Sequence, residues 1–226
     1  MMQPNDVATR YFNAGLVQTL MSSDYFGPDD FPKFLPKHDE FMEALEADAL
    51  ERGVRITGPA VGQLLLVMVR ALGARRVLEL GVAVGYSTIY MAKGLPEGGR
   101  IVAMEWDAEI AAEAASNFKT TGLEDRIDLR VGDAREMMKD EEAGSYDLIF
   151  MDFEKEMYSE ALPDCVRLLR EGGTLLCDNV AFRSSGDFNQ LLVDHPELDT
   201  SFVFGTFYKH SPDDDAISLS VKVARK

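Results

Sequence analysis

The sequence predicts an α/β fold in which seven strands form a mostly parallel sheet with helices on both faces. From residue 76 onward, short apolar runs alternate with amphipathic stretches, as they do in units where a helix connects two parallel strands. The run 148–151 is continuously apolar, which suits a strand buried on both faces. In 216–224 apolar residues fall at alternate positions, which predicts an antiparallel strand with one solvated side.

The predicted elements follow one another in a regular order. Strands are expected at 76–80, 100–105, 127–131, 146–152 and 173–178, then at 200–205 and 216–224. The connecting helices are expected near 86–95, 107–121, 134–142 and 156–170, with another at 185–194. Three helices precede the sheet, at 5–21, 38–52 and 58–72. The glycine-containing stretches 96–99 and 170–173 have the composition of turns and helix ends.

Length and composition predict one globular domain over 1–226, with a helical N-terminal extension at 1–55 and a core at 56–226. Apolar runs fall short of the roughly 20 residues of a membrane helix, and the first residues lack the pattern of a secretory signal. We therefore expect a cytoplasmic protein that does not bind membranes. Its 39 acidic and 23 basic residues give a net charge of −16, which would repel nucleic acid and favours small substrates. Cys165 and Cys177 are expected to be buried free thiols.

Acidic residues occur where the five predicted parallel strands end. In open α/β sheets, ligands bind beyond the carboxyl ends of the strands, so these residues predict a site along one edge of the sheet. The residues concerned are Glu79, Glu105, Asp133, Asp152 and Asp178.

A glycine pair after the first predicted strand indicates a cofactor site. Gly81 and Gly85 permit a tight strand-to-helix turn and close approach of a ligand to backbone N–H groups. The spacing is not the G-x-G-x-x-G of dinucleotide sites. Glu105 could accept hydrogen bonds from both hydroxyls of a ribose. Together they predict a nucleoside cofactor without a diphosphate, such as S-adenosylmethionine, although a nicotinamide-dependent oxidoreductase stays open because its ribose would fit Glu105 equally well.

Three oxygen-bearing residues form a second group: Asp152, Asp178 and Asn179. Two carboxylates and an amide oxygen suit a hard cation such as Mg²⁺. Neighbouring side chains of a strand face opposite ways, so Asp178 and Asn179 can reach one ion only where the strand has ended. The alternative is that these residues cap helices at their amino ends.

Three motifs, "LELGVAVGYST", "FMDFEKEMY" and "LLREGGTLLCDNV", resemble those of the cation-dependent O-methyltransferases, the family of catechol and caffeoyl-CoA O-methyltransferases. The similarity runs from about Ile56 to Val180. It implies a Rossmann-like class I methyltransferase fold and a homodimer. It also implies an enzyme that uses S-adenosylmethionine and a divalent metal to methylate a hydroxyl of a small catechol-like aromatic. A protein that binds the cofactor without catalysis is the remaining alternative.

The resemblance also implies roles for individual residues. Asp152, Asp178 and Asn179 would bind the metal, Mg²⁺ with Mn²⁺ or Ca²⁺ as alternatives, and Lys155 would be the general base beside Asp152. Phe153 and Phe182 depart from the residues common in the family, so we expect a different acceptor pocket. The residues implied to line the cofactor site are Thr57, Gly62, Glu79, Gly81, Val82, Ser87, Glu105, Ala134 and Asp152.

Overall fold

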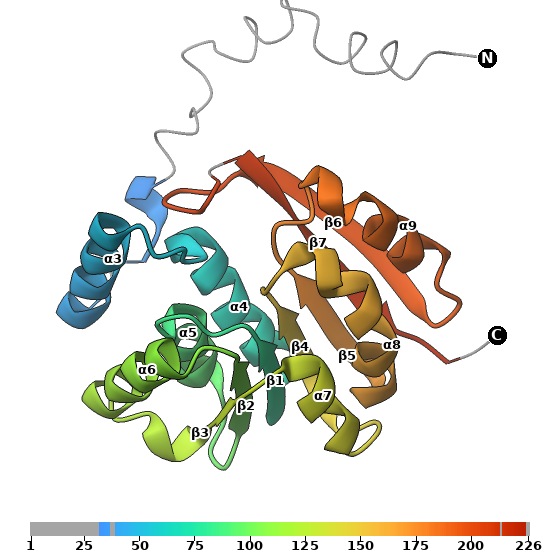
Figure 1. Cartoon of the computed structure of the whole chain (residues 1–226), viewed down its shortest axis with the longest axis horizontal. Coiled ribbons are helices and arrows are strands. Elements are labelled where there is room, and N and C mark those ends of the chain that lie inside the picture. Colours follow the sequence, from blue (N-terminus) through green and yellow to red (C-terminus); the bar gives the residue numbers. More distant parts are fainter. Residues whose placement is uncertain (1–31, 37–38, 213, 225–226) are drawn as a thin grey trace, which may run out of the picture. The chain divides into compact units, whose positions relative to one another are not determined.

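The computed structural model describes residues 32–36, 39–212 and 214–224, and residues 37–226 form one compact unit (Figure 1). Residues 1–36 form a separate unit, of which Pro32–Phe34 make one turn of 3-10 helix. The predicted helix 5–21 lies outside the described residues.

A seven-stranded sheet runs through the larger unit in the order β3-β2-β1-β4-β5-β7-β6. Strands β1 to β5 are parallel, and β7 is antiparallel to both of its neighbours. This confirms the predicted mostly parallel sheet with an antiparallel last strand. The strands are β1 (Arg76–Leu80), β2 (Arg100–Glu105), β3 (Ile127–Val131), β4 (Tyr146–Met151), β5 (Leu169–Cys177), β6 (Leu198–Thr206) and β7 (Asp214–Lys222).

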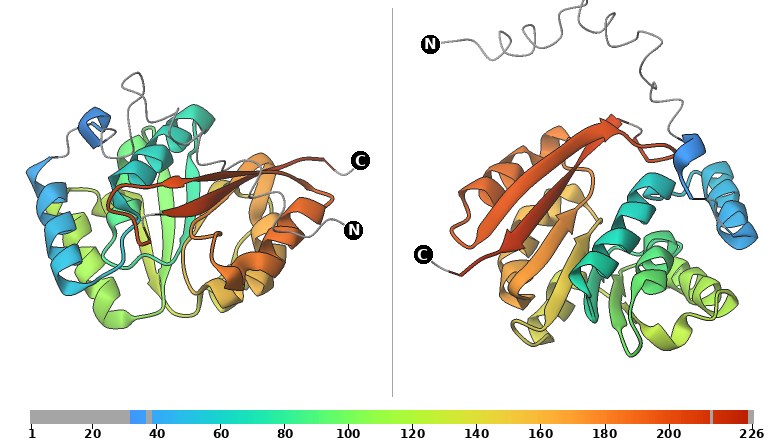
Figure 2. Two further views of the ribbon diagram at one scale, coloured as in Figure 1. Left: turned by 90° about the horizontal axis from the view of Figure 1, so that it is seen from above. Right: turned by 180° about the vertical axis from the view of Figure 1, so that it is seen from behind.

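Helices cover both faces of this sheet (Figures 1 and 2). One face packs against α4 (Gly58–Leu72), α5 (Tyr86–Gly94) and α6 (Ala108–Thr120), and α3 (Glu40–Arg52) joins the apolar cluster of this layer. The other packs against α7 (Ala134–Met137), α8 (Tyr158–Leu168) and α9 (Gly186–Asp194). Each layer buries its own apolar cluster, and none of the described helices is long and apolar enough to cross a membrane.

Helix α3 belongs to this core. Its N-cap Asp39 accepts a hydrogen bond from the N–H of Met42, and Gly53 ends the helix in the left-handed conformation. Met42, Leu45 and Ala49 are buried in the same cluster as α4 and α5. Helix α3 is therefore part of the packing that positions the site.

We expected a turn or a helix end at 170–173, and this prediction is wrong. Helix α8 ends earlier, at Leu168, and the segment is an irregular part of β5. Tyr146 pairs with Leu169 but Leu148 pairs with Thr174, so the segment bulges from the ladder. The physical reason is Asp147 on β4, which accepts a hydrogen bond from Arg170 and others from the backbone N–H groups of Arg75 and Arg76 at the start of β1.

The expected solvated side of β7 is also wrong. Ser218 and Ser220 are fully buried, whereas the apolar Val221 is 40% exposed. Strand β7 lies between β5 and β6 inside the sheet, so helices cover its serine side, where the hydroxyls of Ser220 and Thr200 hydrogen-bond at 2.9 Å. The two cysteines, in α8 and β5, are buried and free, as predicted.

Candidate active site

Two neighbouring cavities open at the carboxyl edge of the parallel strands, with volumes of about 550 and 420 Å³. They share Gly81, Glu105, Trp106 and other residues of this edge. Most of the predicted site residues line one or both. The larger cavity is lined by Thr57, Gly81, Val82, Ser87, Glu105, Asp152, Lys155, Asp178 and Asn179, and the smaller by Gly81, Glu105 and Ala134.

The turn after β1 requires glycine at both of its predicted positions. Gly81 has φ = 87°, and a Cβ there would lie 2.1 Å from the carbonyl oxygen of Asp152. Gly85 has φ = 84°, and a Cβ there would lie 2.4 Å from the ring of Phe118. The turn can therefore lie directly against β4 and α6 only because these residues lack a side chain.

The carboxylate of Glu105 organises this turn. Its Oε2 accepts hydrogen bonds at 2.9 Å from the N–H groups of both Val82 and Ala83, and its Oε1 accepts one at 3.1 Å from Asp107. The side chain is buried yet lines both cavities. The turn is therefore held in place from the end of β2 before any ligand enters.

Two residues implied to line the cofactor site do not line either cavity. Glu79 lies one position before the end of β1, where its Oε1 accepts a hydrogen bond at 2.5 Å from Ser87. Burial raises its pKa to about 8, and the nearby charges of Asp152 and Glu105 act in the same direction. Gly62 lies in α4, where a Cβ would be 2.6 Å from the ring of Tyr90. Close packing of α4 on α5 accounts for this glycine.

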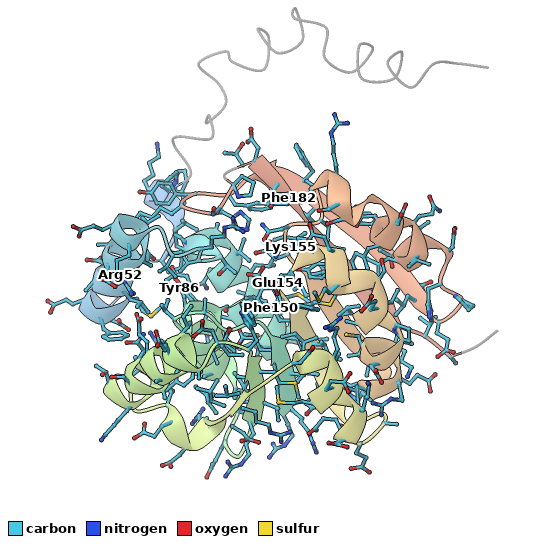
Figure 3. All side chains as sticks on the ribbon, viewed as in Figure 1. Arg52, Tyr86, Phe150, Glu154, Lys155 and Phe182 are labelled. Atoms are coloured by element: carbon cyan, nitrogen blue, oxygen red, sulfur yellow. The ribbon has the colours of Figure 1, made fainter. Side chains whose placement is uncertain are left out.

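Asp152 and Lys155 follow β4 and form an ion pair that borders the larger cavity. The Nζ of Lys155 donates to Oδ1 of Asp152 at 2.6 Å, and it lies 5.3 Å from the ring centre of Tyr158. Both side chains are mostly buried, at 15% and 25% exposed. Figure 3 shows Lys155 beside Glu154 and Phe182, with Tyr86 on the side of α3 and α5.

Asp178 and Asn179 follow β5, and the backbone turns between them and the helix beyond. Asn179 has φ = 55°, so the strand has ended there, which is the condition for both side chains to face one ion. The Nδ2 of Asn179 donates to Oδ2 of Asp215 at 2.5 Å and to the carbonyl of Ser211 at 3.3 Å. These bonds fix the amide and leave its oxygen for a ligand.

His210 is a residue of this site that the sequence did not predict. Its Nε2 lies 2.9 and 3.0 Å from the two carboxylate oxygens of Asp178, and its Nδ1 lies 2.6 Å from the carbonyl oxygen of Pro212. Burial lowers the pKa of His210, but the hydrogen bond to Asp178 and its charge, together with Pro212 and Asp215, outweigh burial and raise the pKa to about 9. Burial and the charge of Asp152 raise the pKa of Asp178.

A signal for His210 and Asp215 was nevertheless present in the sequence. Strand β7 was predicted to be antiparallel, and an antiparallel neighbour of β5 must begin where β5 ends. The pairing of Cys177 with Ser218 shows this arrangement. His210, just before β7, and Asp215, its second residue, therefore reach the same edge as Asp178.

Known proteins resemble this chain in sequence and in structure. A catechol O-methyltransferase from Niastella koreensis is 38% identical over 125 residues, which cover 54% of this chain and 57% of that protein. A caffeoyl-CoA O-methyltransferase from Medicago sativa is 32% identical over 161 residues, 69% of this chain and 64% of that protein. The matched segments thus span less than two thirds of either relative.

A solved structure agrees with these relatives. The O-methyltransferase from Bacillus cereus in complex with SAH has a TM-score of 0.77 and 26% identity, over 85% of this chain and 94% of that one. In addition, the model of the O-methyltransferase family matches residues 38–211, which include the glycine turn, Lys155, Asp178 and His210. The chain therefore belongs to the O-methyltransferase family.

Proposed function

We propose that this protein is an S-adenosylmethionine-dependent and divalent-metal-dependent O-methyltransferase that methylates a hydroxyl of a small catechol-like aromatic. The observation that carries the proposal is that one cavity combines two sets of residues. The glycine turn and Glu105 line it, and so do Asp152, Lys155, Asp178 and Asn179. A methyl donor and an acceptor oxygen could therefore meet in one cavity.

The cofactor half has features that fit S-adenosylmethionine. Thr57 lines the larger cavity, and its hydroxyl oxygen is buried without a hydrogen-bond partner in the described part of the chain. Such a group is costly unless a ligand or water satisfies it. Gly81 gives a ligand access to the backbone, and Glu105 lies between the two cavities. The Bacillus cereus relative in complex with SAH supports the same cofactor.

The metal half fits a hard divalent cation through Asp152, Asp178 and Asn179. Within the described residues, no group of three His, Cys, Asp and Glu side chains could hold a metal, so the proposed set depends on the amide oxygen of Asn179. Asp152 uses only Oδ1 for Lys155, and the repulsion between the two carboxylates favours a cation between them. All three residues line the larger cavity, and their oxygens are the donors that Mg²⁺ prefers.

The proposed chemistry is a direct methyl transfer from sulfur to oxygen. When bound, S-adenosylmethionine supplies the methyl group, and the divalent ion favours ionisation of a phenol whose ordinary pKa is about 10. Lys155, in its neutral form, accepts the hydroxyl proton at Nζ, and Asp152 holds that amine in position. Phe153 and Phe182 line the same cavity and exclude water from the reacting oxygen. The O–CH₃ bond forms as the S–CH₃ bond breaks.

The proposal includes the surroundings of the reaction. We propose a small aromatic acceptor, no nucleic-acid or membrane partner, a homodimer and a cytoplasmic location, on the basis of charge, composition and the family resemblance. Size-exclusion chromatography with light scattering tests the dimer.

Incubation with S-adenosylmethionine, Mg²⁺ and a panel of catechols, with and without EDTA, tests the function. We expect methylated product that EDTA abolishes and Mg²⁺ restores. Turnover that is unchanged in EDTA would reject the metal, and binding of NAD but not S-adenosylmethionine in calorimetry would favour an oxidoreductase. Binding of S-adenosylmethionine without methylation of any acceptor would favour the non-catalytic alternative.

The variant Asp178→Asn keeps the shape of the side chain but removes its charge. We expect a loss of turnover of about 100-fold or more, with cofactor affinity retained, because Asp178 follows β5, which two strands separate from β2 and its Glu105. Asp187→Asn, an exposed residue of α9, is the matched control.

A further inference from the structure

An acidic side chain of α3 is buried behind the cavity wall. Glu46 is 1% exposed and does not line either cavity. Its Oε1 accepts a hydrogen bond from the hydroxyl of Tyr86, and its Oε2 accepts one at 2.8 Å from the Nζ of Lys209. A carboxylate is costly to bury unless it is paired, so these two contacts explain how the fold tolerates it. They do not explain why an acid is there.

One partner of Glu46 lines the larger cavity, and the other adjoins a residue that lines it. Tyr86 is the first residue of α5, directly after Gly85, and it lines the cavity together with Ser87. Lys209 lies in the connection between β6 and β7 with φ = 56°. The next residue along the chain is His210, which lines the cavity and contacts Asp178. Glu46 therefore connects the glycine turn, through Tyr86, with the segment that carries His210, through Lys209.

The connection that carries Lys209 also packs tightly against the start of α4. A Cβ on Gly58 would lie 2.7 Å from the carbonyl oxygen of Tyr208 and 2.8 Å from that of Lys209. Gly58 directly follows Thr57, another residue of the cavity. A shift of the Lys209 segment would thus displace both His210 and Thr57, which line the larger cavity.

Other ion pairs of this helix are weaker candidates for the same role. Arg52 pairs with Glu113 of α6, but these side chains are 41% and 34% exposed. Asp39, the N-cap, pairs with Lys93, and these side chains are 54% and 33% exposed. Exposed ion pairs contribute little, whereas the carboxylate of Glu46 is shielded from water.

We propose that Glu46 is a positioning residue that holds Tyr86 and the Tyr208–Ser211 segment at a fixed separation across the larger cavity. The proposal rests on the proposed function, since methyl transfer depends on the alignment of donor and acceptor held on these two sides. The contact with Lys209 requires the negative charge of Glu46, whereas the contact with Tyr86 requires only a hydrogen-bond acceptor.

This asymmetry makes Glu46→Gln informative. Glutamine can still accept from Tyr86 but no longer neutralises Lys209. We expect kcat/KM for the acceptor to fall about tenfold, with the dissociation constant of the cofactor unchanged within about twofold. Lys209→Gln should have the same effect, and the double variant should be no worse than the worse single variant. Glu51→Gln, an exposed acid of the same helix, is the control.

A second measurement does not depend on turnover. Hydrogen exchange of the peptide that contains 208–211 should be faster in Glu46→Gln and Lys209→Gln than in the wild type, and unchanged in Glu51→Gln. Unchanged exchange, or independent effects that multiply in the double variant, would overturn the proposal. So would a lower melting temperature with kcat and acceptor KM unchanged. A wild type that methylates nothing would reject the proposed function instead, while hydrogen exchange would still test the link through Glu46.

Discussion

The two halves of the larger cavity are built in different ways. At the ends of β1 and β2, backbone groups form the wall, and Glu105 holds them through the N–H groups of Val82 and Ala83. At the ends of β4 and β5, side-chain pairs form the wall, Lys155 with Asp152 and His210 with Asp178. One half is thus a shaped turn, and the other is a set of balanced charges.

This difference separates binding from chemistry. The turn and Glu105 come from one stretch of chain, 81–105, and they can be formed before a ligand arrives. The charged half gathers residues from β4, β5 and the start of β7, whose protonation can change during a reaction. Changes in the first half should therefore alter cofactor affinity, and changes in the second should alter turnover.

The largest effect is expected at Lys155. Lys155→Arg keeps a cation beside Asp152, but an arginine does not release its proton at neutral pH. If Lys155 is the base, both Lys155→Arg and Lys155→Met should lower kcat about 100-fold and leave cofactor affinity nearly unchanged. Initial rates at saturating cofactor measure this, with the exposed Lys139→Arg as the control. A Lys155→Arg enzyme that keeps most of its kcat would show that Lys155 only orients the acceptor.

Glu105 tests the other half. Glu105→Gln weakens the charge-assisted bonds to the turn, each worth about 1.5–3 kcal/mol, so cofactor affinity should fall about 10- to 100-fold while kcat at saturation changes little. The fluorescence of Trp106 reports binding, because it is the single tryptophan, lines both cavities and is 72% exposed. The exposed Glu124→Gln is the control. An effect on kcat alone would contradict the division between the two halves.

Glu79 should make stability depend on pH in the absence of cofactor. Burial raises its pKa from 4.5 to about 8, so between these values the folded protein binds a proton that the unfolded chain releases. The free energy of unfolding therefore falls as pH rises through this window, by roughly 2 kcal/mol between about pH 5 and 7. Glu79→Gln cannot ionise, so its melting temperature should fall less over this range than that of the wild type. If the melting temperatures of the two proteins fall equally with pH, Glu79 ionises normally.

Gly62 should give the smallest effect and distinguishes packing from cofactor binding. In Gly62→Ala the new Cβ would press on Tyr90, so we expect a loss of stability of about 1 kcal/mol and no change in cofactor affinity. Thermal unfolding and Trp106 fluorescence measure the two. In Gly186→Ala the new methyl group meets open space, so this variant is the control. A weaker affinity for the cofactor without loss of stability would instead support a role for Gly62 in the cofactor site.

The sequence predicted the parts of this molecule that depend on local pattern. The apolar runs of β1, β2, β4 and β5 are buried on both faces, and the acids at the ends of β2, β4 and β5 line the cavities. The register shift at 170–173 was not predictable, because it depends on the contact between Arg170 and Asp147 from the neighbouring strand.

The candidate site was predicted where its residues follow parallel strands and was missed where they do not. His210 precedes β7 and Asp215 is its second residue, and only the position of β7 beside β5 brings them to Asp178 and Asn179. The role of Glu46 could not be predicted, because a single acid in a helix gives no sign that its partners are Tyr86 and Lys209. Such contacts depend on tertiary packing.

The place of β7 in the sheet has a consequence for synthesis of the chain on the ribosome. Strand β6 is synthesised before β7, but in the sheet it pairs with β7 and not with β5. Until Asp214–Lys222 has emerged, β6 therefore has no strand to join and Asp178 lacks the segment that carries His210. Lys222 then donates to the carbonyl groups of Val166 and Leu169 and fastens β7 to the end of α8. The metal half of the cavity should be completed last, after the cofactor half has already folded.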